Sequence, residues 1–339
     1  MEPITHGLAA LALARIGQRR LPRFGVSMLL VSGVAADLDY LSYLGGPGAF
    51  LKLHRALFHS ALGSVALIGV VAAGFKFLDR KLPAKNPPAP LKFAAACAVS
   101  TIGVASHVAL DFCNGESVQA LWPFRIISGA WNLTQSLDPW ILFLLLAGLL
   151  LPHLFRLVSD EIGERKKGGV GGRGAAIALI LLLAYLGARA YLRSRAVDLL
   201  LSREFHRREP LAAGAFPSAS TPVNWRGVVT TDNTIEEVEL SLAPGAEFDA
   251  DRSLTHYKPE ESPALRAGQQ TTSAKRFLEY ARFPLASVVR LEDGYRFELR
   301  DMQFAGSDNS PANIFVRADL DSSLGVREEG FHFASSPDP

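Results

Sequence analysis

Several features that mark common protein classes are scarce or missing in this sequence. Only two of its 339 residues are cysteines, and Cys97 and Cys113 fall in or beside one apolar segment. The rise of a helix would separate them by well over ~20 Å, so we expect no disulfide between them. The formal net charge is only +2, which gives no bias toward nucleic acid, and no G-x-S-x-G motif of the common lipases is present. We therefore expect no nucleic-acid partner and no serine nucleophile of that type.

A basic segment before the first apolar run is also missing. Glu2 and His6 precede that run, so the sequence predicts no cleavable signal peptide. Apolar residues are instead concentrated in residues 1–195. Four uncharged runs there approach the ~20 residues that cross a bilayer, and two shorter runs precede them. The long runs are 60–75, 93–110, 139–155 and 174–188, and the short ones are 4–14 and 24–36.

The remainder of the chain has the alternating pattern of strands. We expect an amphipathic helix and a proline-rich linker over 196–222, followed by a small β-rich soluble domain over 223–339. Residues 1–195 are expected to form a mainly α-helical membrane domain of about six transmembrane or short membrane helices. Within the β-rich domain, Asp293-Gly294 is a turn signal and 274–283 is a plausible helix. Strands are expected at 224–231, 235–242, 286–293, 295–304 and 313–320.

Basic residues in the connections predict the orientation of a multi-pass protein in the cytoplasmic (inner) membrane. The connections 15–23, 80–92 and 156–173 hold 13 lysines and arginines, whereas the alternate connections hold 3. The positive-inside rule then places the first set in the cytoplasm and the C-terminal domain outside it. Six arginines between 189 and 208 would lie on the outer side in this orientation, which disagrees with the rule. Long domains, however, translocate largely regardless of charge.

Histidines and aspartates gather at the ends of the apolar segments. His107 and Asp111 are spaced i, i+4, so both side chains share one face of a helix and could hold one ion or two neighbouring ions. The alternative is a buried histidine that is hydrogen-bonded to the aspartate of its own helix. His6 begins the first segment, and in the orientation above it lies on the same, extracytoplasmic side as this pair.

A second group lies between the short and the long apolar runs at 24–36 and 60–75. Asp37 is expected to be a ligand, whereas Asp39 is expected to bridge, to support a ligand or only to cap a turn. We expect His59 to point inward and His54 to lie at or before the start of the helix. Arg55 precedes His59 by four positions and could meet a substrate anion, or it could be a surface or headgroup arginine.

These residues together predict a site for a divalent metal ion. Polar groups next to hydrocarbon are costly unless they have a partner or an ion. Imidazole and carboxylate ligands suit zinc or another first-row metal better than calcium or magnesium. The expected ligands are His6, Asp37, His59, His107 and Asp111, with Asp39, His54 and Arg55 as candidates for the catalytic roles.

The same motifs resemble those of the YdjM-type family of predicted membrane-bound metal-dependent hydrolases. The chain departs from that pattern at Ala36, where family members often have proline. A fainter similarity to zinc-dependent phospholipases C favours phosphoester substrates. The motifs that carry the resemblance are Thr5-His6, Asp37 with Asp39, H-R-x-x-x-H-S from His54 to Ser60, S-H-x-x-x-D from Ser106 to Asp111, and Trp122-Pro123.

The resemblance implies a metal-dependent hydrolase in contact with the lipid bilayer. We expect a phosphoesterase that acts on a lipid or lipid-linked substrate at the outer face of the cytoplasmic membrane. A metal-containing scaffold or regulatory protein, whose β-rich domain binds a protein partner of unknown identity, is an alternative. An ion transporter is another, although transporters tend to place such residues near the midplane in repeated helices.

Overall fold

The computed structural model describes residues 1–82, 89–126, 128–161, 170–218, 221–304 and 313–334. Parts of the expected linker (219–220) and of the expected β-rich domain (305–312 and 335–339) lie outside the described residues, as do Lys85, Arg165, Lys166 and Lys167 of the orientation count. The described chain forms two compact units. One consists of residues 1–39 and 55–190, and the other of residues 40–54 and 191–339.

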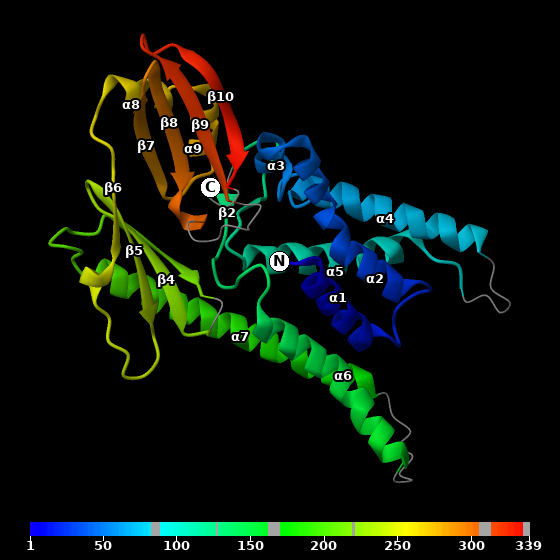
Figure 1. The fold of residues 1–339 in the computed structure, drawn as a ribbon. Helices are drawn as coiled ribbons and strands as arrows, with labels where there is room; N and C mark the ends of the chain where they lie inside the picture. The colour runs from blue at the N-terminus through cyan, green and yellow to red at the C-terminus, as the bar shows by residue number, and fades with distance from the viewer. Residues whose placement is uncertain (83–88, 127, 162–169, 219–220, 305–312, 335–339) are drawn as a thin grey trace. The chain divides into compact units, whose positions relative to one another are not determined.

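The first unit is helical (Figure 1). Five helical segments in the described residues are long and apolar enough to cross a membrane, which confirms the expected helical membrane architecture. The short first run forms a helix of 15 residues that is not among the five. The helices are α1 (Pro3–Gly17), α2 (Gly25–Val34) with a 3₁₀ continuation (Ala35–Gly45), α4 (Ala61–Lys81), α5 (Phe93–Phe112), α6 (Pro139–Glu161) and α7 (Val170–Leu201).

Local sequence explains where several of these helices begin and how they pack. Pro3 opens α1, where its missing N–H costs nothing. The Ser60 hydroxyl caps α4 by accepting from Gly63 N at 3.1 Å. Helices α6 and α7 approach closely at Gly148, where a Cβ would lie 2.3 Å from the Ala178 Cβ. Small residues thus allow close helix packing in a lipid environment, where apolar burial alone gives little driving force.

The second unit contains two four-stranded antiparallel sheets (Figure 1). In the first sheet the strand order is β3-β4-β5-β6, and in the second it is β10-β9-β8-β7. The β-rich character that the alternating pattern predicts is confirmed. The strands are β3 (Ala212–Pro217), β4 (Asn224–Thr230), β5 (Thr234–Ser241), β6 (Leu254–Tyr257), β7 (Pro284–Leu291), β8 (Gly294–Asp301), β9 (Ile314–Asp321) and β10 (Val326–Phe333).

Some local expectations for this unit differ from the structure. The helix expected at 274–283 is present as α9 (Thr272–Leu278), which ends earlier than expected, and a further short helix, α8 (Pro263–Gln269), precedes it. The turn signal at Asp293-Gly294 marks a real β7–β8 hairpin, but Gly294 already pairs with Leu291. A Cβ at Gly294 would lie 1.9 Å from Leu320 O, so this glycine permits a close approach of β9.

An excursion from the helical half completes the second unit. Residues 40–54, which contain α3 (Pro47–Leu53), belong to the same compact unit as the sheets. Phe50 is 2 % exposed and packs in one cluster with Leu265, Phe297 and Val316. A segment between Asp39 and Arg55 is therefore part of the β-sheet core.

Candidate metal centre

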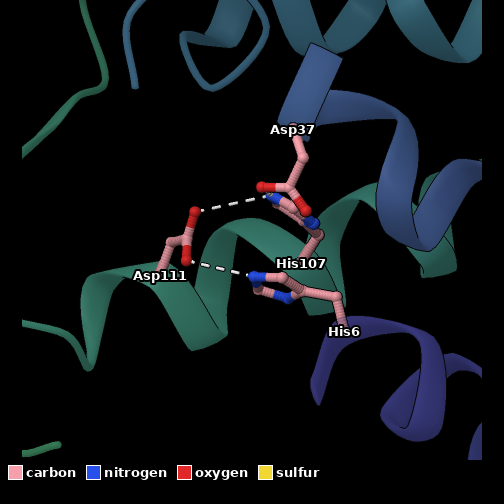
Figure 2. A group of neighbouring side chains, drawn as sticks. All are labelled: His6, Asp37, His107 and Asp111. Atoms are coloured by element: carbon pink, nitrogen blue, oxygen red, sulfur yellow. Dashed lines mark hydrogen bonds and ion pairs between the residues drawn. The ribbon is translucent and has the colours of Figure 1, made fainter. Parts of the chain in front are cut away.

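The last two turns of α5 supply the central pair of the candidate centre. His107 and Asp111 are fully buried, and their side chains share one face of the helix (Figure 2). His107 Nε2 lies 3.4 Å from Asp111 Oδ2. The i, i+4 spacing therefore places the two side chains on one face of the helix, as expected, and their polar atoms lie next to each other.

His6 of α1 and Asp37 of the 3₁₀ continuation of α2 join this pair. His6 Nε2 lies 3.2 Å from Asp111 Oδ1, and His107 Nε2 lies 3.7 Å from Asp37 Oδ1. One ligand atom from each of the four residues lies within 4.8 Å of the others. Figure 2 shows the four side chains pointing toward one another from three separate elements. This is a grouping of two imidazoles and two carboxylates that could hold a metal ion.

Close packing of α2 on α5 orients His107. His107 Nδ1 donates to Gly33 O at 2.8 Å, so Nδ1 carries the proton and Nε2 presents a lone pair to the group. A Cβ at Gly103 would lie 2.0 Å from Ser32 Oγ, and one at Gly33 would lie 2.7 Å from the Ala10 Cβ. These two glycines permit the approach that places the Gly33 carbonyl behind the His107 ring.

His59 faces the same point from the chain just before α4. Its Nε2 lies 3.0 Å from His107 Nε2 and 2.8 Å from Asp111 Oδ2, and its Nδ1 lies 2.9 Å from Asp39 Oδ2. With the His59 proton on Nδ1 toward Asp39, two imidazole lone pairs and a carboxylate oxygen face one another. Such a set of acceptors is repulsive unless a cation lies among them.

The charge balance at His59 supports this conclusion. Burial would lower the pKa of His59, but hydrogen bonds with Asp111 and Asp39 outweigh it and raise the pKa to about 9. The position therefore attracts positive charge, either as a proton or as a metal cation.

Three further observations describe the surroundings of the donor set. Two buried atoms of the group, His6 Nδ1 and Asp37 Oδ2, have no hydrogen-bond partner among the described residues. The His6 ring also stacks on the His107 ring, with centroids 3.7 Å apart and an interplanar angle of 24°. Asp111 Oδ1 additionally accepts a hydrogen bond from the α-amino group of Met1. Imidazole with carboxylate is the ligand chemistry of zinc and its first-row neighbours.

Arg55 lies beside the group and is only 2 % exposed. Its Nε lies 3.1 Å from Glu116 Oε2, and its Nη2 lies 3.5 Å from Asp111 Oδ1. Its Nη1 donates to Glu116 O at 3.1 Å. The guanidinium thus contacts the chain's own carboxylates, which offsets part of the negative charge of the group and holds residues 111–116 in position.

His54 has different surroundings. Its ring stacks on Phe50, with centroids 4.3 Å apart, and lies 4.3 Å from the Tyr40 ring centroid. These three residues belong to the unit that contains the sheets. The structure therefore groups His54 with the aromatic residues of the 40–54 excursion.

Sequence reasoning missed three contributors, namely Gly33, Gly103 and Glu116. Both glycines lie inside apolar helices, where a small residue is a known signal of close packing but does not identify the partner. Glu116 follows Asp111 by five residues, in a connection with no helical periodicity. Its partner Arg55 lies 61 positions away, and no local pattern indicates that pairing.

Comparison with known protein families places most of the helical half in one family. The family model described as YdjM inner membrane protein matches residues 1–196, which include every residue of the candidate metal centre. A search of curated proteins and a search of solved structures gave no match.

Proposed function

Because the chain belongs to the YdjM inner membrane protein family, we propose that it is a membrane-bound, metal-dependent hydrolase of phosphoester bonds in a lipid or lipid-linked substrate. The observation that carries this proposal is the convergence of His59 Nε2, His107 Nε2 and Asp111 Oδ2 within 3.4 Å of one another. Histidines held in one tautomer by partners on Nδ1 are the usual preparation for a metal ligand.

We assign His6, Asp37, His107 and Asp111 as the principal ligands and His59, whose Nε2 lies 2.8 Å from Asp111 Oδ2, as a further ligand. Zinc is the ion that this donor set suits best. A bound divalent ion would supply a water of lowered pKa and would stabilise negative charge on the scissile group.

The remaining residues have supporting roles in this proposal. Asp39 holds the His59 ring in orientation, because Asp39 Oδ2 lies 2.9 Å from His59 Nδ1 and leaves His59 Nε2 to act as the ligand atom. Arg55 holds Asp111 and Glu116 and so positions a ligand, instead of contacting substrate. His54 would contribute through the fold of the 40–54 excursion.

We further propose that the site and the β-rich domain (223–339) lie on the extracytoplasmic side of the membrane. The excess of lysine and arginine in the connections after α1, α4 and α6 supports this orientation. Fusion of a reporter that is active only in the cytoplasm to residue 339 would test it, and an active fusion would reverse the assignment.

The central experiment is metal analysis of purified protein together with a substrate panel. His107→Ala and Asp111→Ala should each lose most of the bound metal and at least 100-fold in hydrolysis of a phosphodiester such as bis-p-nitrophenyl phosphate. His153→Ala is the matched control, because His153 is exposed on α6 and lies outside the group. Full metal content in both site variants would refute the proposed centre. Bound metal without turnover of any substrate, and unfolding on chelation, would favour a structural metal in a scaffold protein.

A further inference from the structure

A small hairpin after α5 presents exposed apolar residues. Strands β1 (Val118–Gln119) and β2 (Ser128–Gly129) pair in antiparallel register. The turn between them exposes Leu121 at 47 %, Phe124 at 84 % and Ile126 at 42 %. Single exposed apolar residues are common on protein surfaces, but a group of them in a short turn marks an interaction surface.

The base of the hairpin is attached to the end of α5. Trp131 N donates to Phe112 O at 2.8 Å, and Leu133 N donates to Cys113 O at 2.8 Å. Helix α5 is a candidate membrane span that ends at Phe112, and the next span begins at Pro139. The hairpin therefore lies in the connection between two candidate spans, and its base is attached to the end of the first.

The same hairpin is joined to the metal centre. Gln119 N donates to Arg55 O at 2.9 Å, and Ala61 N donates to Ala120 O at 2.9 Å. The Arg55 side chain in turn contacts both Glu116 and Asp111. These hydrogen bonds and ion pairs fix the position of the turn relative to Asp111.

Charge in the hairpin matches a membrane surface. Arg125 is the only charged residue between positions 117 and 131, and it is exposed next to Phe124. Trp131 is 57 % exposed at the base. Aromatic rings and an arginine at the end of a span are the composition that settles at the level of lipid headgroups, where rings contact the upper acyl chains and a guanidinium contacts phosphate.

We infer that the turn 120–126 inserts into the interfacial layer of the bilayer and thereby presents the metal centre to the headgroup phosphate of a membrane phospholipid. The substrate class, a phosphoester at headgroup depth, rests on the proposed hydrolase function. The insertion of the turn does not rest on it. Soluble phosphoesters would lack the local concentration and alignment that the bilayer supplies.

Insertion is tested by site-directed fluorescence on the full chain in vesicles of phosphatidylcholine and phosphatidylglycerol. An environment-sensitive dye is attached to Phe124→Cys in a background with Cys97→Ala and Cys113→Ala. The control in the same background carries the dye at Ser322→Cys, an exposed turn position between β9 and β10. Spin-labelled lipid should quench the dye at 124 at least threefold more than the dye at 322, and aqueous iodide should show the reverse. Equal quenching by iodide at the two positions would overturn the insertion.

The substrate class is tested with Leu121→Ser/Phe124→Ser. This double variant should lose at least tenfold in hydrolysis of phospholipid in vesicles, while its metal content and its rate on bis-p-nitrophenyl phosphate stay within twofold of the original chain. Equal losses on both substrates would contradict a role in lipid presentation. If the unsubstituted chain hydrolyses neither substrate, the hydrolase proposal and the substrate class both fail, and the fluorescence result still decides the insertion.

Discussion

The backbone N–H of Arg55 donates to Asp39 Oδ2 at 2.7 Å, although 16 positions separate the two residues. The chain between them forms the 40–54 excursion, in which Phe50 packs with residues of the β10-β9-β8-β7 sheet. Arg55 has a φ of 54°, a left-handed backbone conformation that an arginine adopts only when its surroundings enforce it. The contact closes the excursion at its base and fixes the carboxylate that orients His59.

Replacement of Asp39 by asparagine should weaken metal binding without abolishing it. Asp39 Oδ2 faces both His59 Nδ1 and Arg55 N, and an amide removes the charge that holds the imidazole. Loss of such a supporting carboxylate lowers metal affinity by roughly 10–100-fold. Competition with a chelating dye would measure the change. Asp79→Asn is the control, since Asp79 pairs with Arg23 at 2.9 Å outside the group, and equal affinity in both variants would exclude the supporting role.

Replacement of Gly103 by alanine should disturb the centre from a distance. The added Cβ would lie 2.0 Å from Ser32 Oγ and 3.1 Å from Gly33 N, so α2 must move away from α5. That movement lengthens the hydrogen bond from His107 Nδ1 to Gly33 O, and overpacking of this kind costs about 1–3 kcal/mol. Gly74→Ala on α4 is the matched control, because no atom lies within 4 Å of its added Cβ. Thermal unfolding in detergent and metal titration should separate the two variants, and identical behaviour would show that the close approach is unimportant.

Truncation of Phe50 should destabilise the unit that contains the sheets. Phe50 is buried among residues of α8, β8 and β9, so Phe50→Ala should cost about 3–5 kcal/mol in the free energy of unfolding. Phe77→Ala, at a ring that is 59 % exposed on α4, should leave this transition within ~0.5 kcal/mol. Denaturant unfolding followed by the fluorescence of Trp225, which is buried in β4, reports on this unit. A small effect of Phe50→Ala would show that the excursion is only loosely attached.

The stability of the same unit should depend on pH through Glu236. Burial would raise the pKa of this carboxyl, but hydrogen bonds from Thr255 and Ser253 outweigh it and lower the pKa below its ordinary value of 4.5. Because the folded pKa is depressed, the stabilisation is complete above pH ~4.5 and is lost as the pH falls through the folded pKa. Relative to Glu236→Gln, the original chain should therefore be more stable at pH 7, by about 1–3 kcal/mol, with a difference that shrinks below pH ~4.5. A difference that stays constant down to pH 3 would contradict this assignment.

The sequence predicts most of the helical half because long apolar runs and an i, i+4 pair are local signals. It also predicts that the five expected ligands lie at the segment ends that face one side of the membrane. The structure brings their side chains together. These residues are His6, Asp37, His59, His107 and Asp111. The roles of these five as ligands remain a prediction. The sequence does not identify Gly33 and Glu116 as contributors to the site, because each acts through a contact with a residue more than 50 positions away.

The β-rich half was predicted less completely. Strand β3 (AAGAFP) has no β-branched residue, and β6 has only four residues, so neither carries a strong strand pattern. Strand β10 (VREEGFHF) contains a run of charges on an edge of its sheet. The membership of residues 40–54 in this half depends on contacts of Phe50 with residues more than 200 positions later, and no sequence periodicity encodes it.

The 40–54 excursion has a consequence for biosynthesis. Phe333, whose ring centroid lies 6.0 Å from that of Phe50, is translated about 280 residues after it. At ~5–20 residues per second, this interval is roughly 14–56 s, during which α3 emerges from the ribosome before the strands it needs exist. A chain that stalls or is cleaved in that interval leaves Phe50 without the residues of α8, β8 and β9 that bury it, so an incomplete copy exposes this apolar side chain.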